Sequence, residues 1–234
     1  MIRIEDVNIY GWEAAIRGMR NPKNSWNLSD TDFSVECPNP GNYGACTECK
    51  YFNGFYAPCT PAIGPNDLKL MKTLSKAGSD HGKYLRMITV TLDITAPLYW
   101  WKEFDTYKVG TVADSCSTMH KIHSKEFEID DFSHEHLHST MGESYEAIDC
   151  LEQIIDLLNK YRELYNETDD EYWWWQMIQL LPSSYNQRRT IQLNYQVLKN
   201  MYHARKNHKL DEWIDFCHWV ESLPYFSDLI APTI

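Results

Sequence analysis

The segment from Ile88 to Thr95, ITVTLDIT, places apolar and polar residues in strict alternation. Successive side chains of a β-strand point to opposite faces, so this pattern predicts a strand with one buried face. From Ala147 onward, apolar residues instead recur at the three- and four-residue spacing of a helix. A chain that combines both patterns is neither all-helical nor all-strand. We therefore expect an α/β (α+β) fold with a helix-rich second half.

Other segments predict the elements around this strand. The start of the chain, IRIEDVNIY, predicts a strand, and GWEAAIRGM predicts a short helix after it. Prolines interleave with glycines and asparagines from Asn21 to Gly64, which predicts irregular structure. Order resumes in a helix capped by Asn66 or Asp67, and a long helix is expected from about Gln187 to His208. We expect one domain, residues 1–234, with 21–64 as an irregular insertion.

The charge balance excludes some classes of partner. The chain carries 33 acidic and 22 basic residues, a formal net charge of −11. An acidic surface repels phosphate backbones and anionic lipids, which argues against general nucleic-acid binding. No apolar run approaches the length of a membrane span, and the first residues have no apolar signal-peptide core. We expect a cytoplasmic protein without a membrane partner.

Four of the seven cysteines gather in the irregular insertion: Cys37, Cys46, Cys49 and Cys59. Four thiolates can satisfy a tetrahedral zinc ion, and the close Cys-x2-Cys pair is the usual zinc knuckle. Such a site would be structural, because four cysteines leave no open coordination position. The outer gaps follow no standard spacing, so four unrelated loop cysteines remain an alternative.

The predicted helix near the end of the chain carries a polar stripe. At about 100° per residue, Asn194, Arg205 and His208 fall close together on its surface. A guanidinium is the side-chain group best suited to a phosphate or a planar imide. The alternative is an ordinary solvated face.

Two segments together resemble the flavin-dependent thymidylate synthase (ThyX-type) family. In the first, DHGKYLRMITVTLDITAPLYWWKEFDTYK, a histidine-led stretch precedes a strand and then a helix. In the second, NYQVLKNMYHARKNHKLDEW, asparagines, an arginine, a histidine and a tryptophan follow in the family's order. The resemblance covers roughly Asp67 to Ser222 and leaves 21–64 unexplained. It implies a ThyX-like fold, with an antiparallel sheet flanked by long helices.

The resemblance also implies a reaction and a set of site residues. The implied reaction is one-carbon transfer from a folate donor to C5 of a pyrimidine deoxynucleotide such as dUMP, with FAD as cofactor, in a homotetramer. Arg205 would be the catalytic residue, because the family's arginine grips and polarises the pyrimidine. The implied substrate contacts are Arg205, Asp114, Cys116 and Ser117. The implied cofactor contacts are His81, Tyr107, Lys108, Thr111, Asn194, Asn200 and His208.

The chain departs from the family where anions are bound. The family's Arg-His-Arg triplet aligns with Thr106, Tyr107 and Lys108, and a later arginine aligns with Thr118. Gln196 replaces an arginine that contacts the flavin phosphate. Each lost charge-assisted hydrogen bond is worth about 1.5–3 kcal/mol, so FAD and dUMP binding should be weaker by orders of magnitude unless other groups compensate.

Basic residues near these positions could replace the lost positive charge: Lys83, Arg86, Arg188 and Arg189.

Three hypotheses for the function follow. The chain is a divergent enzyme of the resembled type, a catalytically inactive module that binds a nucleotide or a partner, or an unrelated structural protein. The asparagines, Arg205 and His208 favour the first two.

Overall fold

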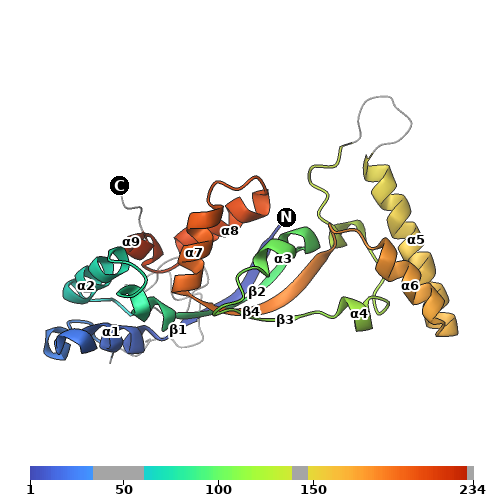
Figure 1. Cartoon of the computed structure of the whole chain (residues 1–234). Coiled ribbons are helices and arrows are strands. Elements are labelled where there is room, and N and C mark those ends of the chain that lie inside the picture. The colour runs from blue at the N-terminus through green and yellow to red at the C-terminus, as the bar shows by residue number, and fades with distance from the viewer. Residues whose placement is uncertain (34–60, 139–146, 231–234) are drawn as a thin grey trace, which may run out of the picture. The chain divides into compact units, whose positions relative to one another are not determined.

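The computed structural model describes residues 1–33, 61–138 and 147–230 (Figure 1). By their internal contacts, these residues form two compact units, which are described one at a time. The first unit comprises Met1–Arg3, Ile94–Thr106 and Asp114–Arg189. The second comprises Ile4–Asp93, Tyr107–Ala113 and Thr190–Ile234. That residues 1–234 form a single domain stays a prediction.

Four strands form one antiparallel sheet in the order β1-β2-β4-β3. Their bounds are Arg3–Tyr10 for β1, Thr89–Pro97 for β2, Val112–Ser115 for β3 and Asn186–Asn194 for β4. In β2 every second side chain is buried: Val90, Leu92, Ile94 and Ala96. The expected strand and the α+β fold class are therefore confirmed.

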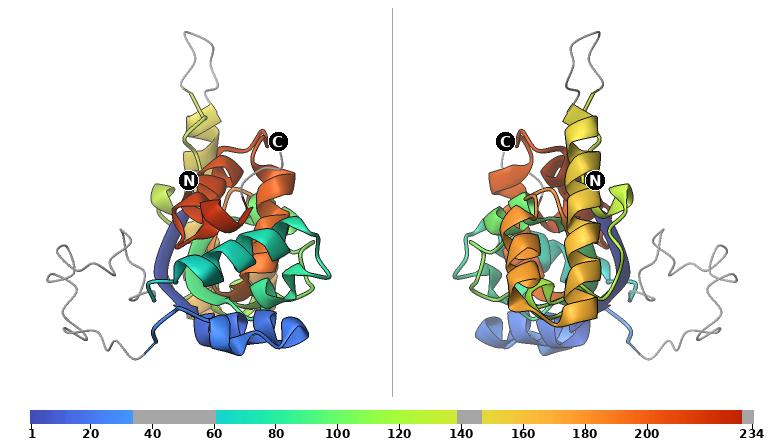
Figure 2. Two further views of the ribbon diagram at one scale, coloured as in Figure 1. Left: turned by 90° about the vertical axis from the view of Figure 1, so that its left-hand side faces the viewer. Right: turned by 90° about the vertical axis from the view of Figure 1, so that its right-hand side faces the viewer.

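In its described residues, the first unit contains four α-helices and one 3-10 helix. They are α3 (Leu98–Phe104), α4 (Thr118–Lys121), η5 (Ile129–Asp131), α5 (Ala147–Thr168) and α6 (Glu171–Leu180). Helices α5 and α6 lie side by side, as the right-hand view of Figure 2 shows. Asp169 adopts a positive φ of 53° in the tight turn between them. The Asp170 side chain then caps α6 by accepting the backbone N–H of Tyr172 at 2.9 Å.

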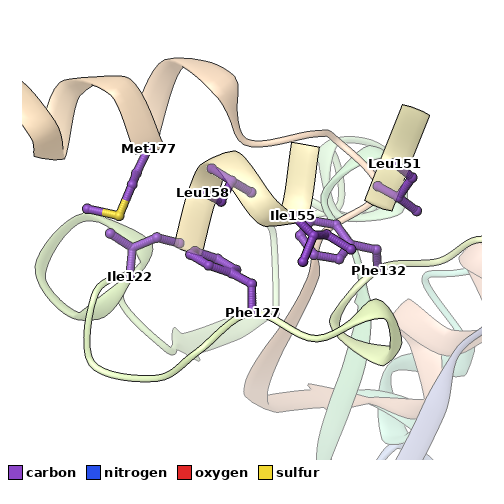
Figure 3. Packing of buried hydrophobic residues seen from close by; sticks show 7 residues of the cluster. All are labelled: Ile122, Phe127, Phe132, Leu151, Ile155, Leu158 and Met177. Carbon is purple, nitrogen blue, oxygen red and sulfur yellow. The ribbon is translucent and has the colours of Figure 1, made fainter. Parts of the chain in front are cut away.

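A small apolar cluster holds this helix pair to the chain before it. Figure 3 shows its members: Ile122, Phe127, Phe132, Leu151, Ile155, Leu158 and Met177. Leu158 is 0% exposed at its centre. The preceding residue, Leu157, points outward and is 41% exposed.

These two neighbours give a matched pair of variants. We expect Leu158→Ala to lower the free energy of unfolding by about 3 kcal/mol, because it removes buried methyl groups and leaves a cavity. Leu157→Ala should cost about 1 kcal/mol or less. Both variants replace leucine with alanine, and both residue types are strong helix formers, so a difference in helix propensity cannot explain a difference in stability. Urea unfolding of both variants is the measurement, and equal costs would contradict the cluster.

The second unit gathers the remaining helices: α1 (Trp12–Arg20), η1 (Asn21–Lys23), η2 (Trp26–Leu28), α2 (Pro65–Lys76), η4 (Gly82–Arg86), α7 (Tyr195–Arg205), α8 (Asp211–Ser222) and α9 (Phe226–Ile230). Tyr195 lies at the centre of this unit. Its ring meets Trp12 and Phe226 edge-on, at 5.4 and 5.7 Å between centroids. Its hydroxyl donates to the carbonyl of Pro224 at 2.8 Å. Burial raises the pKa of this phenol well above its ordinary value.

The continuous helix predicted from Gln187 to His208 is wrong. Residues up to Asn194 belong to β4, and α7 begins only at Tyr195. Asn194 has extended backbone and caps the helix, because its Oδ1 accepts the N–H of Val197 at 3.1 Å. The error has a simple cause: the four-residue spacing from Ile191 to Tyr195 fits a strand period of 2 as well as a helix period of 3.6.

The start of the predicted insertion is fixed against α2. Asp30 caps this helix by accepting the N–H groups of Asn66 and Asp67 at 2.9 and 3.1 Å. The expected cap at Asn66 or Asp67 is therefore wrong. Thr31 donates its hydroxyl to Asp67 Oδ2 at 2.7 Å and accepts the N–H of Gly64 at 2.9 Å. The two described ends of the insertion thus meet.

Asp67 is 0% exposed and forms an ion pair with Arg20, at 2.6 Å between Oδ1 and Nε. Its other oxygen accepts hydrogen bonds from Ser29 and from the backbone of Asp30, besides those of Thr31.

In the part of the chain that is described, no helix is both long and apolar enough to cross a bilayer.

Candidate functional site

Arg205 is the last residue of α7 and is half-buried in the second unit. Its Nε donates to the hydroxyl of Tyr107 at 3.0 Å. Its Cζ lies 4.9 Å from the ring centroid of Trp213 and 5.7 Å from that of Tyr107. Aromatic faces attract a guanidinium, and the C-terminal end of a helix favours a cation. The side chain is therefore held at one edge and against two rings.

His208 lies just beyond the end of α7. Its backbone N–H donates to the carbonyl of Arg205 at 2.9 Å, and its Nδ1 accepts the N–H of Leu210 at 3.2 Å. Its ring meets Trp213 edge-on, at 6.3 Å between centroids. The shared helical stripe predicted for Arg205 and His208 does not exist, yet a turn after the helix still brings the two residues to the same tryptophan.

The segment from Tyr107 to Thr111 follows α7 from its end to its beginning. Tyr107 contacts Arg205 at one end. Gly110 has a φ of +81°, and a Cβ at this position would lie 3.1 Å from Val197 and 3.2 Å from the amide nitrogen of Asn194. Only glycine suits so close an approach in this conformation.

The hydroxyl of Thr111 lies next to this approach. It is enclosed and has no hydrogen-bond partner among the described residues. Such a group costs about 1–3 kcal/mol when left unpaired.

The remaining cofactor candidates of the second unit also lie around α7. His81 is exposed at the start of η4, which packs on α7. A Cβ added to the next residue, Gly82, would lie 3.7 Å from the amide oxygen of Gln196. Gln196 in turn donates to Oδ1 of Asn200 at 3.0 Å. The first turns of α7 therefore bring these polar groups together.

Three of the predicted substrate contacts belong to the first unit. Asp114 is exposed on β3. Cys116 has an exposed, free thiol, and its backbone N–H donates to the carbonyl of Arg188 at 3.0 Å. Ser117 caps α4 by accepting the N–H of His120 at 3.0 Å. These residues share one short stretch of chain, separate from the unit that holds Arg205.

The compensating cations differ in what they already bind. Arg189 is only 14% exposed, with Nη1 2.8 Å from Asp105 and Cζ 4.2 Å from the ring centroid of Trp101. It is committed to the first unit. Arg188 is exposed in the same unit. Lys83 and Arg86 are exposed on η4 of the second unit, where they add positive charge beside α7.

The metal hypothesis is not tested. Within residues 1–33, 61–138 and 147–230, no group of three or more histidines, cysteines or carboxylates is placed to hold a metal ion. The four predicted zinc ligands lie outside the described residues: Cys37, Cys46, Cys49 and Cys59. A structural zinc in the insertion stays a prediction.

Two crystal structures of thymidylate synthase X (ThyX) from Helicobacter pylori, both with FAD and dUMP, are similar to this chain. The first has a TM-score of 0.62 and 16% identity, and the match covers 98% of this chain and 97% of that one. The second has a TM-score of 0.60 and 16% identity, with 96% and 97% covered. The chain has the fold of ThyX. No protein-family model and no curated protein matches the sequence.

The match confirms the predicted resemblance to ThyX and the predicted ThyX-like fold. Two residues that shape the site were missed. Trp213 is one of nine tryptophans, and nothing local distinguished it from those of the core. Gly110 carries a possible signal, since a glycine between two predicted ligand residues indicates backbone that approaches another element closely.

Proposed function

We propose that the chain is a divergent flavin-dependent thymidylate synthase-like enzyme. It would transfer a one-carbon unit to C5 of a dUMP-like pyrimidine deoxynucleotide, with FAD as cofactor and a folate as donor. One observation carries the proposal: α7 gathers polar groups from three segments of the second unit, within a fold shared with a protein that holds FAD and dUMP. Those groups are His81, Tyr107, Lys108, Thr111, Asn194, Asn200, Arg205 and His208.

The residues around α7 include the types of side chain that bind an anionic cofactor: basic groups, amides and a hydroxyl. The unpartnered hydroxyl of Thr111 is the group that a ligand or a small loop shift would satisfy. Lys83, Arg86 and Lys108 are exposed and basic in the same unit. Asn194 and Asn200 offer amides that can donate and accept. When bound, FAD would supply the redox chemistry of the transfer.

Arg205 would bind and polarise the pyrimidine. A half-buried guanidinium acts in a lower dielectric than water, so it stabilises negative charge that develops on a carbonyl more strongly. Tyr107 and Trp213 orient it before substrate arrives. His208 lies against the same tryptophan and would be a further ring at the edge of the site.

A second candidate function is a catalytically inactive module that binds a nucleotide or a partner. It is favoured by the residues that replace the family's arginines. Thr106 donates its hydroxyl to the carbonyl of Glu103, and Gln196 donates to Asn200. Thr118 opens α4 and is also neutral. None of the three side chains carries a charge.

The homotetramer and the cytoplasmic location remain predictions.

Absorption spectroscopy and nucleotide titration test the proposal together. We expect purified protein supplied with FAD and then desalted to retain a flavin band. We expect Arg205→Ala to weaken dUMP binding by about tenfold or more in calorimetric titration, because a hydrogen bond to a charged group is lost.

Arg17→Ala is the matched control, since Arg17 is exposed on α1 beside Glu13 and should leave dUMP binding unchanged. A well-folded protein that retains no flavin but binds dUMP would favour the inactive module. Titrations in which Arg205→Ala behaves like Arg17→Ala would remove Arg205 from the site.

A further inference from the structure

We propose that Tyr107 is a positioning residue that sets the plane of the Arg205 guanidinium for the nucleotide. The inference rests on the proposed function and deepens it. It gives Tyr107, the central residue of the triplet that replaces the family's Arg-His-Arg, the role of orienting Arg205. Nothing in the resemblance requires a phenol at this position.

The contact geometry constrains the guanidinium at two different places. The Tyr107 hydroxyl accepts from Nε at 3.0 Å, which fixes one edge of the planar group. The ring of Trp213 lies 4.9 Å from Cζ, which constrains one face. A planar group held at an edge and against a face has little freedom to rotate.

Tyr107 is itself held in place. Its ring meets Trp213 edge-on, at 6.2 Å between centroids and an interplanar angle of 63°. Three residues later, Gly110 is pressed against Asn194 and Val197 at the other end of α7. The phenol is therefore supported by its own ring contact and by the anchored segment that follows it.

Pre-organisation of the Arg205 side chain should raise the affinity for dUMP by an amount that can be measured. A long side chain that must be immobilised on binding costs affinity, and one that is already immobilised does not. Without the hydroxyl, Nε loses its hydrogen bond to Tyr107, while the ring of Trp213 still lies against the face. We expect Tyr107→Phe to weaken dUMP binding about three- to tenfold, with little change in the unfolding midpoint.

Tyr202→Phe is the matched control. Tyr202 lies on the same helix, and its hydroxyl bonds to the Glu221 carboxylate, which raises the pKa of the phenol to about 12. The substitution also removes one hydroxyl bonded to a charged group, but that group is the Glu221 carboxylate and not the Arg205 guanidinium. Its dUMP affinity should equal that of the unaltered chain.

A double-mutant cycle separates positioning from general destabilisation. In the Arg205→Ala background, Tyr107→Phe should have no further effect on dUMP binding, because the group it positions is gone. Additive losses would overturn the inference and leave the proposed function standing. So would a Tyr107→Phe protein that binds dUMP as tightly as the Tyr202→Phe protein.

A ligand-free measurement keeps the inference testable when no nucleotide binds. By NMR, the Nε–H of Arg205 should exchange with water more slowly than that of exposed Arg17, and Tyr107→Phe should speed the exchange at Arg205 while leaving Arg17 unchanged. If dUMP fails to bind while this protection is present, the proposed function falls and the contact stands. Absence of protection would overturn the positioning role, whatever the titration shows.

Discussion

Asp67→Ala should lower the free energy of unfolding by about 3–5 kcal/mol, measured by urea denaturation. The carboxylate is 0% exposed and is bonded to Arg20, Ser29, Asp30 and Thr31. Removing it leaves the guanidinium of Arg20 buried without its partner charge. It also frees the segment that caps α2. Loss of one partner from a buried pair is costly for this reason, even where the intact pair adds little.

The same site predicts how stability depends on pH. Burial alone would raise the pKa of Asp67, but hydrogen bonds from Thr31, Ser29 and Arg20, with the charge of Arg20, lower it below its usual value. A carboxyl whose pKa is lower in the folded state binds its proton more tightly when unfolded. Its contribution is therefore complete above about pH 3.9, the ordinary value, and is lost as the pH falls through the folded-state pKa.

The exposed pair of Lys72 and Asp228 is the control. Both groups are partly solvated, at 38% and 47% exposure, so Asp228→Ala should cost less than about 1 kcal/mol. Asp67→Ala should also flatten the acid limb of the stability profile. Similar costs for the two variants would mean that Asp67 is not buried as described.

Gly11→Ala should be comparably severe, with a loss of at least about 4 kcal/mol. Gly11 precedes α1 with a φ of +90°, and an added Cβ would lie 2.0 Å from the carbonyl oxygen of Met87. The obstacle is a backbone carbonyl two residues before β2, and it cannot rotate away as a side chain could. The helix or the strand would have to shift.

Gly78 separates the two sources of this cost. It has a φ of +104°, but a Cβ there would meet nothing within 4 Å. Gly78→Ala should therefore cost only the backbone strain, about 1–2 kcal/mol. Denaturation of the two alanine variants measures the difference, which reports the steric overlap alone. Equal losses would show that α1 can move away from Met87 at no cost.

Local patterns were sufficient for several elements. The alternation in β2 and the helical spacing that begins at Ala147 in α5 each have one interpretation, and the structure bears them out. The boundary between β4 and α7 was missed because a four-residue spacing fits both periods. The cap of α2 was missed because it comes from Asp30, more than 30 residues earlier, and no local rule connects such positions.

Some residues of the candidate site could be found from the sequence, whereas the contacts between them could not. Arg205 and His208 were singled out by a helical stripe that the structure does not contain and by a resemblance in short motifs. The bond from Arg205 to Tyr107 joins residues 98 positions apart, which a single sequence does not reveal. Trp213 faces Arg205 only because a turn follows α7 and reverses the chain into α8.

The meeting of Thr31 with Gly64 has an evolutionary consequence. Both points belong to one anchor built on Asp67, because Thr31 donates to the Asp67 carboxylate and accepts the N–H of Gly64. The free energy of closing a loop grows only with the logarithm of its length. The anchor at Thr31 and Gly64 can therefore close over different numbers of intervening residues at nearly the same entropic cost. We expect related chains to differ most in length between these two points, while the residues that form the anchor are kept.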